Sequence, residues 1–175
     1  MNIKVVKFGG SSLADAEHFK QVASIIKADP NRRFVVASAP GKRCKEDIKV
    51  TDMLYECYEK ARNNENIDDI YQKIVDRYND IIKGLGLDFD ISGEFEYVKS
   101  ALKHRSGRDF AASRGEYLNS LILAKYLKYD FVDAENVICF RDNGTLDEEK
   151  TNEMMREELL QHKFAVIPGF YGVIY

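Results

Sequence analysis

The residues best suited to chemistry follow a short, strand-like run near the amino terminus. After residues 3–6 the chain continues as Lys7-Phe8-Gly9-Gly10-Ser11-Ser12, and a helical pattern comes next. The lysine provides a positive charge, and the glycines let backbone N–H groups close around a small anion where the helix begins. The pattern therefore predicts that Lys7, Gly9, Gly10 and Ser11 bind phosphate. Taken singly, such a lysine is more often a surface residue, and such a turn more often only connects a strand to a helix.

Two hydroxyl residues stand at the ends of other predicted elements. Ser38 follows the buried strand pattern Phe34–Ala37, at the carboxyl end of a strand, where open α/β sheets bind ligands. Thr51, with Asp52, is suited to cap the next helix, whose N-terminus would then point toward a bound anion. Both are candidates for a binding site, although Ser38 alone can simply close a strand and Thr51 alone can simply be a cap.

Glu116 is the third candidate. It follows Gly115 in a segment that is otherwise apolar and helical. Glycine in a helix costs about 1 kcal/mol relative to alanine, so its presence indicates that something packs closely against the backbone there. Judged alone, Glu116 is most often a solvated surface carboxylate. Arg114 either pairs with a carboxylate or lies on the surface.

Four stretches together resemble the aspartate kinases, within the amino-acid kinase superfamily. In the family's order they are Lys7 to Ser12, Val35-Val36-Ala37-Ser38-Ala39-Pro40-Gly41, Val50-Thr51-Asp52, and Ser113-Arg114-Gly115-Glu116. A further stretch, Gly169-Phe170-Tyr171-Gly172, resembles the turn that borders the family's substrate pocket; without the family it would be taken for a hairpin turn.

The resemblance implies a role for each candidate. Lys7 would be the catalytic residue, taking charge that develops on the transferred phosphoryl group, and Lys7, Gly9, Gly10 and Ser11 would hold the phosphates of ATP. Ser38, Thr51 and Glu116 would line the aspartate pocket, with Glu116 on the amino group. Mg²⁺ would be held mainly through the phosphates, so no metal ligand is expected from the protein.

The activity implied is ATP-dependent phosphorylation of the side-chain carboxylate of L-aspartate to 4-phospho-L-aspartate. This is the first step of the aspartate-derived pathway to lysine, threonine and methionine, and the complete enzyme is expected to be a homo-oligomer. Because a carboxylate is already ionised at neutral pH, no general base is needed. Two alternatives remain open, a related kinase of the glutamate or acetylglutamate type and a non-catalytic binding or assembly module of the same fold.

The elements that must position these residues predict an α/β fold. Asp15 is suited to cap a helix with an apolar face, and the buried strand Phe34–Ala37 follows, which makes a βαβ unit with parallel strands. A helical insertion is predicted at about 51–129, and strands return at 131–132, 137–140 and 164–168, with a helix at about 146–161. The expected architecture is three-layer αβα around a mostly parallel sheet.

Bulk properties exclude several functional classes. The 175 residues are 45% hydrophobic, enough for one domain, and the net charge of -3 leaves no basic stripe for nucleic acid or an anionic membrane. The three cysteines have no metal-ligand spacing, and no apolar run approaches the roughly 18 residues of a membrane span. A cytoplasmic protein with small-molecule partners is expected.

The chain also looks truncated. It ends on an apolar run after a Gly-rich turn, where a last strand would offer an unpaired hydrophobic edge. Residues 1–175 are therefore expected to be the N-terminal part of an amino-acid kinase catalytic domain, without the nucleotide-binding half or regulatory domains. Such a piece is expected to be inactive alone.

Overall fold

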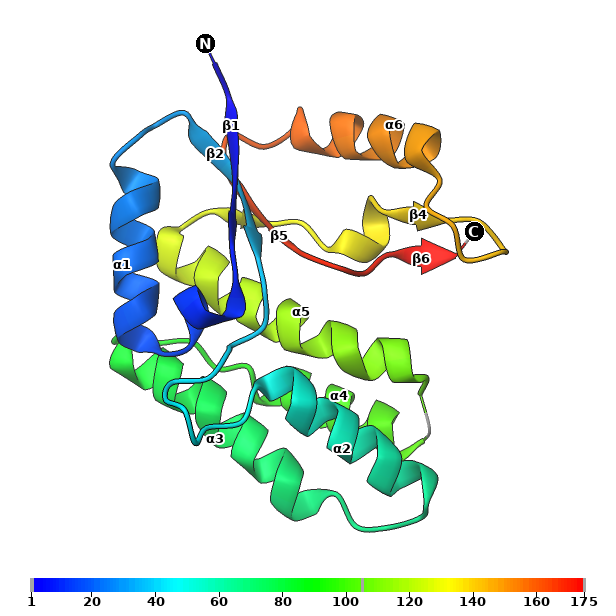
Figure 1. Ribbon diagram of the computed structural model, residues 1–175. Coiled ribbons are helices and arrows are strands. Elements are labelled where there is room, and N and C mark those ends of the chain that lie inside the picture. Colours follow the sequence, from blue (N-terminus) through cyan, green and yellow to red (C-terminus); the bar gives the residue numbers. More distant parts are fainter. Residues whose placement is uncertain (1, 105, 175) are drawn as a thin grey trace.

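A four-stranded parallel sheet forms the centre of the computed structural model, which describes residues 2–104 and 106–174 (Figure 1). Its order is β1 (Lys4–Phe8), β2 (Arg32–Ala37), β5 (Ala165–Pro168) and β3 (Asp130–Phe131). Phe8 pairs with Ala37, and Ala37 pairs with Pro168. The carboxyl ends of β1, β2 and β5 therefore stand level at one edge of the sheet, where the predicted site residues begin.

The first βαβ unit forms as the sequence predicts. A short 3₁₀ turn, η1 (Gly10–Leu13), leads into α1 (Ala16–Lys27), and the Asp15 side chain accepts a hydrogen bond from the His18 backbone N–H at 3.0 Å. This is an N-cap, which satisfies an otherwise unpaired donor of the first turn. The apolar face of α1 is buried, and β1 and β2 run parallel, so both expectations are confirmed.

The helical insertion is confirmed as four consecutive helices on one side of the sheet. They are α2 (Val50–Arg62), α3 (Asp68–Gly84), α4 (Ser92–Lys103) and α5 (Arg108–Leu127). Helix α5 packs directly on β2, β3 and β5, and α2, α3 and α4 lie beyond it (Figure 1). Helix α5 is thus the element that can carry side chains to the sheet edge.

The predicted N-cap at Thr51 is wrong. Helix α2 begins at Val50 with Lys49 as its N-cap residue, so Thr51 lies inside the first turn. The reason is tertiary, because the fully buried Val50 donates its backbone N–H to the Pro40 carbonyl at 3.2 Å. This contact with the preceding loop fixes the start of the helix two residues earlier than a cap at Thr51 would place it.

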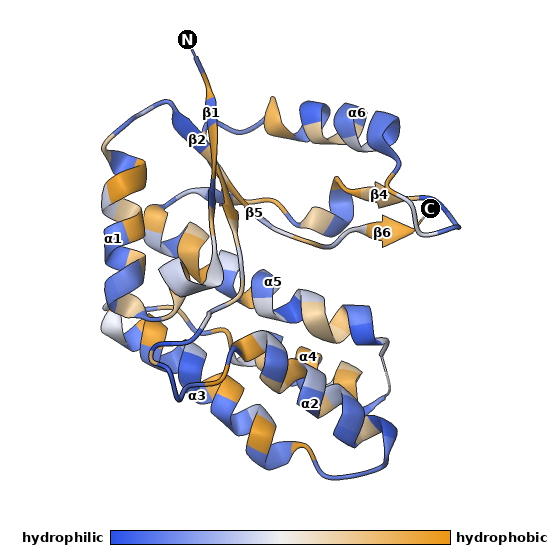
Figure 2. Ribbon diagram, viewed as in Figure 1, coloured by the Kyte–Doolittle hydropathy of each residue, from blue (hydrophilic) through white to orange (hydrophobic). Residues whose placement is uncertain are grey.

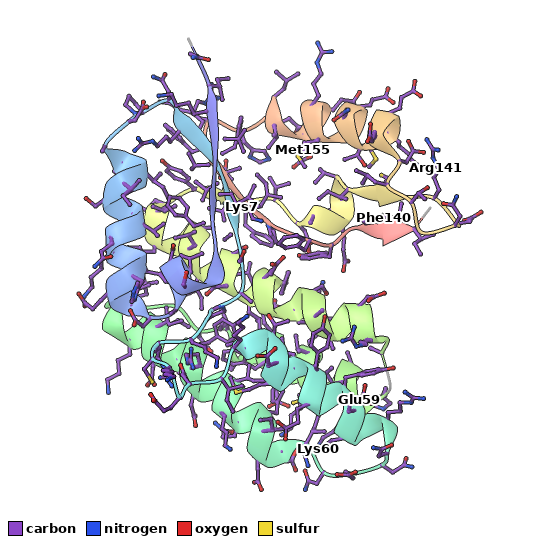
Figure 3. The ribbon with its side chains drawn as sticks, in the orientation of Figure 1. Lys7, Glu59, Lys60, Phe140, Arg141 and Met155 are labelled. Atoms are coloured by element: carbon purple, nitrogen blue, oxygen red, sulfur yellow. The ribbon has the colours of Figure 1, made fainter. Side chains whose placement is uncertain are left out.

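The opposite face of the sheet is covered by α6 (Glu148–Leu159). Met155 and Leu159 of this helix pack against Phe34 and Ile167 of the sheet, and Figure 3 shows Met155 directed toward it. Hydropathy colouring shows α6 as largely hydrophilic and the sheet strands as mostly hydrophobic (Figure 2). Helices on both faces make the three-layer αβα arrangement that was predicted.

The last part of the chain departs from the predicted strands. In place of a strand over 137–140, a 3₁₀ turn, η2 (Ala134–Asn136), precedes the shorter β4 (Cys139–Phe140). Ile138 donates its N–H back to the Ala134 carbonyl at 2.8 Å, which prevents an extended backbone there. Strand β6 (Val173–Ile174) pairs with β4 in parallel and forms a separate two-stranded sheet with it.

Across the described ranges, no helix has both the length and the apolar character required to cross a membrane.

Candidate active site

Two loops meet at the carboxyl edge of the sheet. We call residues 9–14, after β1, the first loop, and residues 38–49, between β2 and α2, the second loop. The Gly41 N–H donates to the Gly10 carbonyl at 2.8 Å. A Cβ added to Gly41 would lie 2.6 Å from the Gly10 carbonyl carbon, and one on Gly10 would lie 2.8 Å from the Ala39 oxygen. The two loops therefore touch backbone to backbone, which requires glycine on both sides.

Gly9 differs from Gly10. A Cβ at this position would meet nothing within 4 Å, and the backbone, with φ of -80°, is open to any residue. The protein itself therefore does not require glycine there. An unobstructed backbone at a strand end leaves space for a ligand to approach.

A cavity of about 410 Å³ opens between the two loops and α5. It contains five of the seven predicted site residues, whereas Lys7 and Gly9 lie outside its lining. The lining consists of Gly10, Ser11, Ser38, Ala39, Pro40, Gly41, Lys42, Lys49, Thr51 and Glu116. One carboxylate and two cations thus face a space of the size that small ligands occupy.

Glu116 is buried beneath this cavity, with 8% of its surface exposed, so a solvated surface carboxylate is excluded. Its Oε2 atom is buried and has no hydrogen-bond partner among the described residues. Burial raises the pKa of Glu116 to about 8, and the positive charge of Lys7 acts in the opposite direction. An unpaired carboxyl of this kind is suited to receive a cationic hydrogen-bond donor from a ligand.

The close packing predicted at Gly115 is confirmed. A Cβ there would lie 2.9 Å from the Ala39 Cβ and 3.2 Å from a Leu54 methyl group. The absence of a side chain allows α5 to approach both the second loop and α2. This approach brings Glu116 to the cavity.

Lys7 lies on β1 and is exposed (Figure 3). Its Nζ lies 4.2 Å from the centroid of the Phe170 ring, a cation–π contact. Phe170 itself is 82% exposed and has a left-handed φ of 63°, which is uncommon for a residue other than glycine. Burial raises the pKa of Glu116 and the positive charge of Lys7 opposes that rise, so Lys7 lies within electrostatic range of the cavity.

The turn of residues 169–172 borders the same region. The Gly169 N–H donates to the Ala37 carbonyl at 3.2 Å, and a Cβ on Gly169 would lie 3.4 Å from Glu116 Oε2. Because the turn links β5 to β6, which belong to different sheets, it is not a hairpin.

Sequence reasoning missed three polar residues at the site. Lys42 and Lys49 line the cavity, and Asn119 lies one helical turn after Glu116. The fully buried Asn119 donates its Nδ2 hydrogen to the Ser38 carbonyl at 2.7 Å. The available signal was the spacing of Glu116 and Asn119, which places two polar side chains on one face of α5.

Arg114 now has a defined environment. It is 3% exposed, pairs with Glu135 at 2.9 Å, and stacks its guanidinium near the rings of Tyr117 and Tyr171. The expectation of a surface residue is therefore excluded in favour of carboxylate pairing. Arg114 joins α5 to the chain around η2 and the 169–172 turn.

The site fits an anion better than a protein-bound metal. Nowhere in residues 2–104 and 106–174 do three or more His, Cys, Asp or Glu side chains gather as metal ligands. The first loop offers backbone N–H groups, and Lys7, Lys42 and Lys49 offer positive charge. Phosphate groups match these donors, and a divalent ion would have to be held through them.

Comparison with known proteins agrees with this geometry. The chain is 32% identical to aspartokinase 3 of Bacillus subtilis, over 97% of its own length and 40% of the relative's. Its structure matches an aspartate kinase of Clostridium acetobutylicum with a TM-score of 0.97 and 47% identity, covering 100% of this chain and 40% of that one. It also matches the fold of E. coli aspartokinase III in complex with aspartate and ADP, with a TM-score of 0.78 and 22% identity, covering 98% of this chain and 41% of that one.

The chain therefore spans about 40% of the length of these proteins. The sequence profile of the amino acid kinase family matches residues 2–174, nearly the whole chain. The chain belongs to the amino acid kinase family.

Proposed function

We propose that this chain is the N-terminal part of an aspartate kinase catalytic domain, which phosphorylates the side-chain carboxylate of L-aspartate with ATP. The observation that carries the proposal is the cavity in which Gly10 and Ser11 face the unpaired carboxyl of Glu116. One side of this space suits phosphate and the other suits an amino group. Relatives named as aspartokinases support the choice of aspartate.

Each site residue receives a role in this proposal. Glu116 binds the amino group of aspartate, while Ser38 and Thr51 line the pocket around its body. The first loop presents backbone N–H groups to the phosphates, and Lys7 stabilises negative charge on the transferred phosphoryl group. Mg²⁺ neutralises the phosphates when bound with ATP.

The chemistry then depends on position and charge. An oxygen of the aspartate side chain forms a bond to the γ-phosphorus as the bond to the leaving ADP oxygen breaks, so no proton has to be removed. Asn119 holds the Ser38 carbonyl, which keeps the pocket wall in place during the transfer.

The remaining parts of the proposal concern the complete protein. Because the chain spans about 40% of the length of its aspartokinase relatives, we infer that a nucleotide-binding half and regulatory domains lie outside these 175 residues and that the chain alone does not turn over. We further propose a cytoplasmic, homo-oligomeric enzyme that starts the biosynthesis of aspartate-derived amino acids.

Hydroxylamine trapping of the acyl phosphate tests this function. The assay compares the 175-residue chain with a hybrid in which it replaces the matching part of the Clostridium acetobutylicum aspartate kinase. The expected result is hydroxamate from the hybrid with ATP, Mg²⁺ and aspartate, and none with glutamate or from the chain alone. Product with glutamate would favour a related kinase. Aspartate binding by the chain without product from the hybrid would favour a binding module.

A further inference from the structure

Arg77 is a buried cation that the proposed mechanism does not use. It lies on α3, within a stripe of apolar residues, and only 4% of it is exposed. Its side chain crosses from the helical layer to the two loops. Nη1 donates to the Gly41 carbonyl at 3.0 Å and to the Ala14 carbonyl at 3.5 Å, and Nη2 donates to Asp47 Oδ2 at 2.6 Å and to the Ile48 carbonyl at 3.3 Å.

These acceptors belong to the two loops that border the cavity. Ala14 ends the first loop, Gly41 is the residue that touches Gly10, and Ile48 directly precedes the cavity residue Lys49. A single guanidinium therefore joins the end of the first loop to both ends of the segment 41–48. Three of its hydrogen bonds go to backbone carbonyls, so Arg77 acts on the site through the backbone of the loops.

Asp47 ties the second loop to the same point. Its carboxylate also accepts hydrogen bonds from the Arg43 backbone N–H at 2.9 Å and from Arg43 Nε at 2.9 Å. The Arg43 hydrogen bonds, together with the charge of Arg77, hold the pKa of Asp47 well below its usual range. The carboxylate thus stays ionised, and the buried guanidinium keeps its counter-charge at neutral pH.

We propose that Arg77 is a positioning residue that fixes the first loop against the second loop and so sets the geometry of the cavity; its significance for catalysis rests on the proposed function. A planar guanidinium directs donors at several acceptors at once, which a lysine ammonium on a flexible stem does not reproduce. Its four hydrogen bonds described above all go to loop residues, so Arg77 organises the site and not the helical core.

The test compares Arg77→Lys and Arg77→Met with the wild-type chain, and Lys73→Met serves as a matched control because Lys73 is an exposed cation on the same helix. Amide hydrogen exchange reports the loops directly, since the Gly41 N–H bonds to Gly10 and the Arg43 N–H bonds to Asp47. Exchange at these amides should rise about tenfold or more in both Arg77 variants, while amides of β2 and α5 keep their protection. Lys73→Met should match the wild type. If Arg77→Met does not fold, Arg77→Lys carries the test.

L-Aspartate affinity supplies the second readout. Arg77→Lys should weaken binding about tenfold or more and leave its pH dependence unchanged, whereas Glu116→Gln should abolish that dependence. Unchanged exchange at Gly41 in Arg77→Lys would overturn the proposal, and so would loosened loops with unaltered aspartate affinity. If the wild-type chain binds no aspartate, the KM for aspartate and the kcat of the hybrid replace this readout. The proposal would then be overturned if Arg77→Lys left both the KM and the kcat unchanged. A wild-type hybrid without activity would instead count against the proposed function, and loop exchange alone would then decide the role of Arg77.

Discussion

Aspartate binding should depend steeply on pH because of Glu116. Its carboxyl is buried, lacks a hydrogen-bond partner among the described residues, and has a pKa raised to about 8. Binding a ligand ammonium requires the ionised form, which is about 1% of the free protein at pH 6, about 9% at pH 7 and about half at pH 8. If the bound carboxylate stays ionised throughout, affinity should fall about fivefold from pH 8 to 7 and about 50-fold from pH 8 to 6.

Calorimetry of aspartate binding in buffers of different ionisation enthalpy measures the affinity and the number of protons released on binding. At pH 7 about 0.9 proton should be released for each aspartate bound, because most Glu116 carboxyls must ionise. Glu116→Gln is the matched variant: it should bind more weakly and show neither proton release nor the pH dependence. A carbon-13 NMR titration of the Glu116 carboxyl in the ligand-free chain should give a midpoint near 8.

The same raised pKa makes a prediction for stability. Since the folded-state pKa lies above the ordinary value of 4.5, the folded state is destabilised as pH rises from 4.5 toward 8, by no more than about 5 kcal/mol. Glu116→Gln should therefore unfold at a higher temperature than the wild type at pH 8, and the two should converge below pH 4.5. An NMR midpoint near 4.5, or affinity that does not change between pH 6 and 8, would refute the argument.

Three further predictions concern the loops and Lys7. In the hybrid, Lys7→Ala should reduce kcat by an amount that corresponds to about 2 to 4 kcal/mol of transition-state stabilisation, with a smaller effect on aspartate affinity. Steady-state kinetics in which only the aspartate affinity changed would contradict this role of Lys7. Gly41→Ala should lower the free energy of unfolding by about 1 to 3 kcal/mol, because its Cβ would overlap the Gly10 backbone. Gly9→Ala should change the free energy of unfolding by less than about 0.5 kcal/mol, because a Cβ there meets nothing. Equal losses for the two variants in urea unfolding would be inconsistent with the loop contact. Because the pKa of Asp47 is depressed, its ionised carboxylate stabilises the fold above about pH 4, and this contribution is lost as the pH falls further. The difference in melting temperature between Asp47→Asn and the wild type should therefore become smaller on acidification, which thermal unfolding measures.

Local patterns were sufficient where neighbours in the sequence determine the structure. The Asp15 cap and the apolar spacing of α1 depend on contacts within a few residues, and both formed as predicted. The short crossover from β1 to β2 leaves the parallel arrangement as the strongly preferred topology, so the pairing also followed.

Residues whose role depends on distant partners were not predictable in the same way. The start of α2 is decided by the bond from Val50 to Pro40, which outweighs the capping tendency of Thr51. Arg77 looks like one polar residue on an amphipathic helix, because its acceptors lie 29 to 63 positions away. The role of Asn119 likewise depends on its hydrogen bond to the Ser38 carbonyl, which is distant in the sequence. Five of the seven residues chosen by family resemblance line one cavity, and tertiary contacts revealed the residues that hold its walls.

The order of the strands constrains how the chain is made as well as how it is held. Strand β5 pairs with β2 on one side and with β3 on the other, yet it follows both in the sequence. On a ribosome adding about 5 to 20 residues per second, roughly 6 to 25 s separate the end of β2 from the arrival of β5. Throughout that interval one edge of β2 lacks its final neighbour, and β3, once it has been made, has no partner strand until β5 arrives. A nascent chain of this topology therefore passes through a stage in which open strand edges can pair with other chains. Factors that cover such edges during synthesis should raise the yield of folded protein.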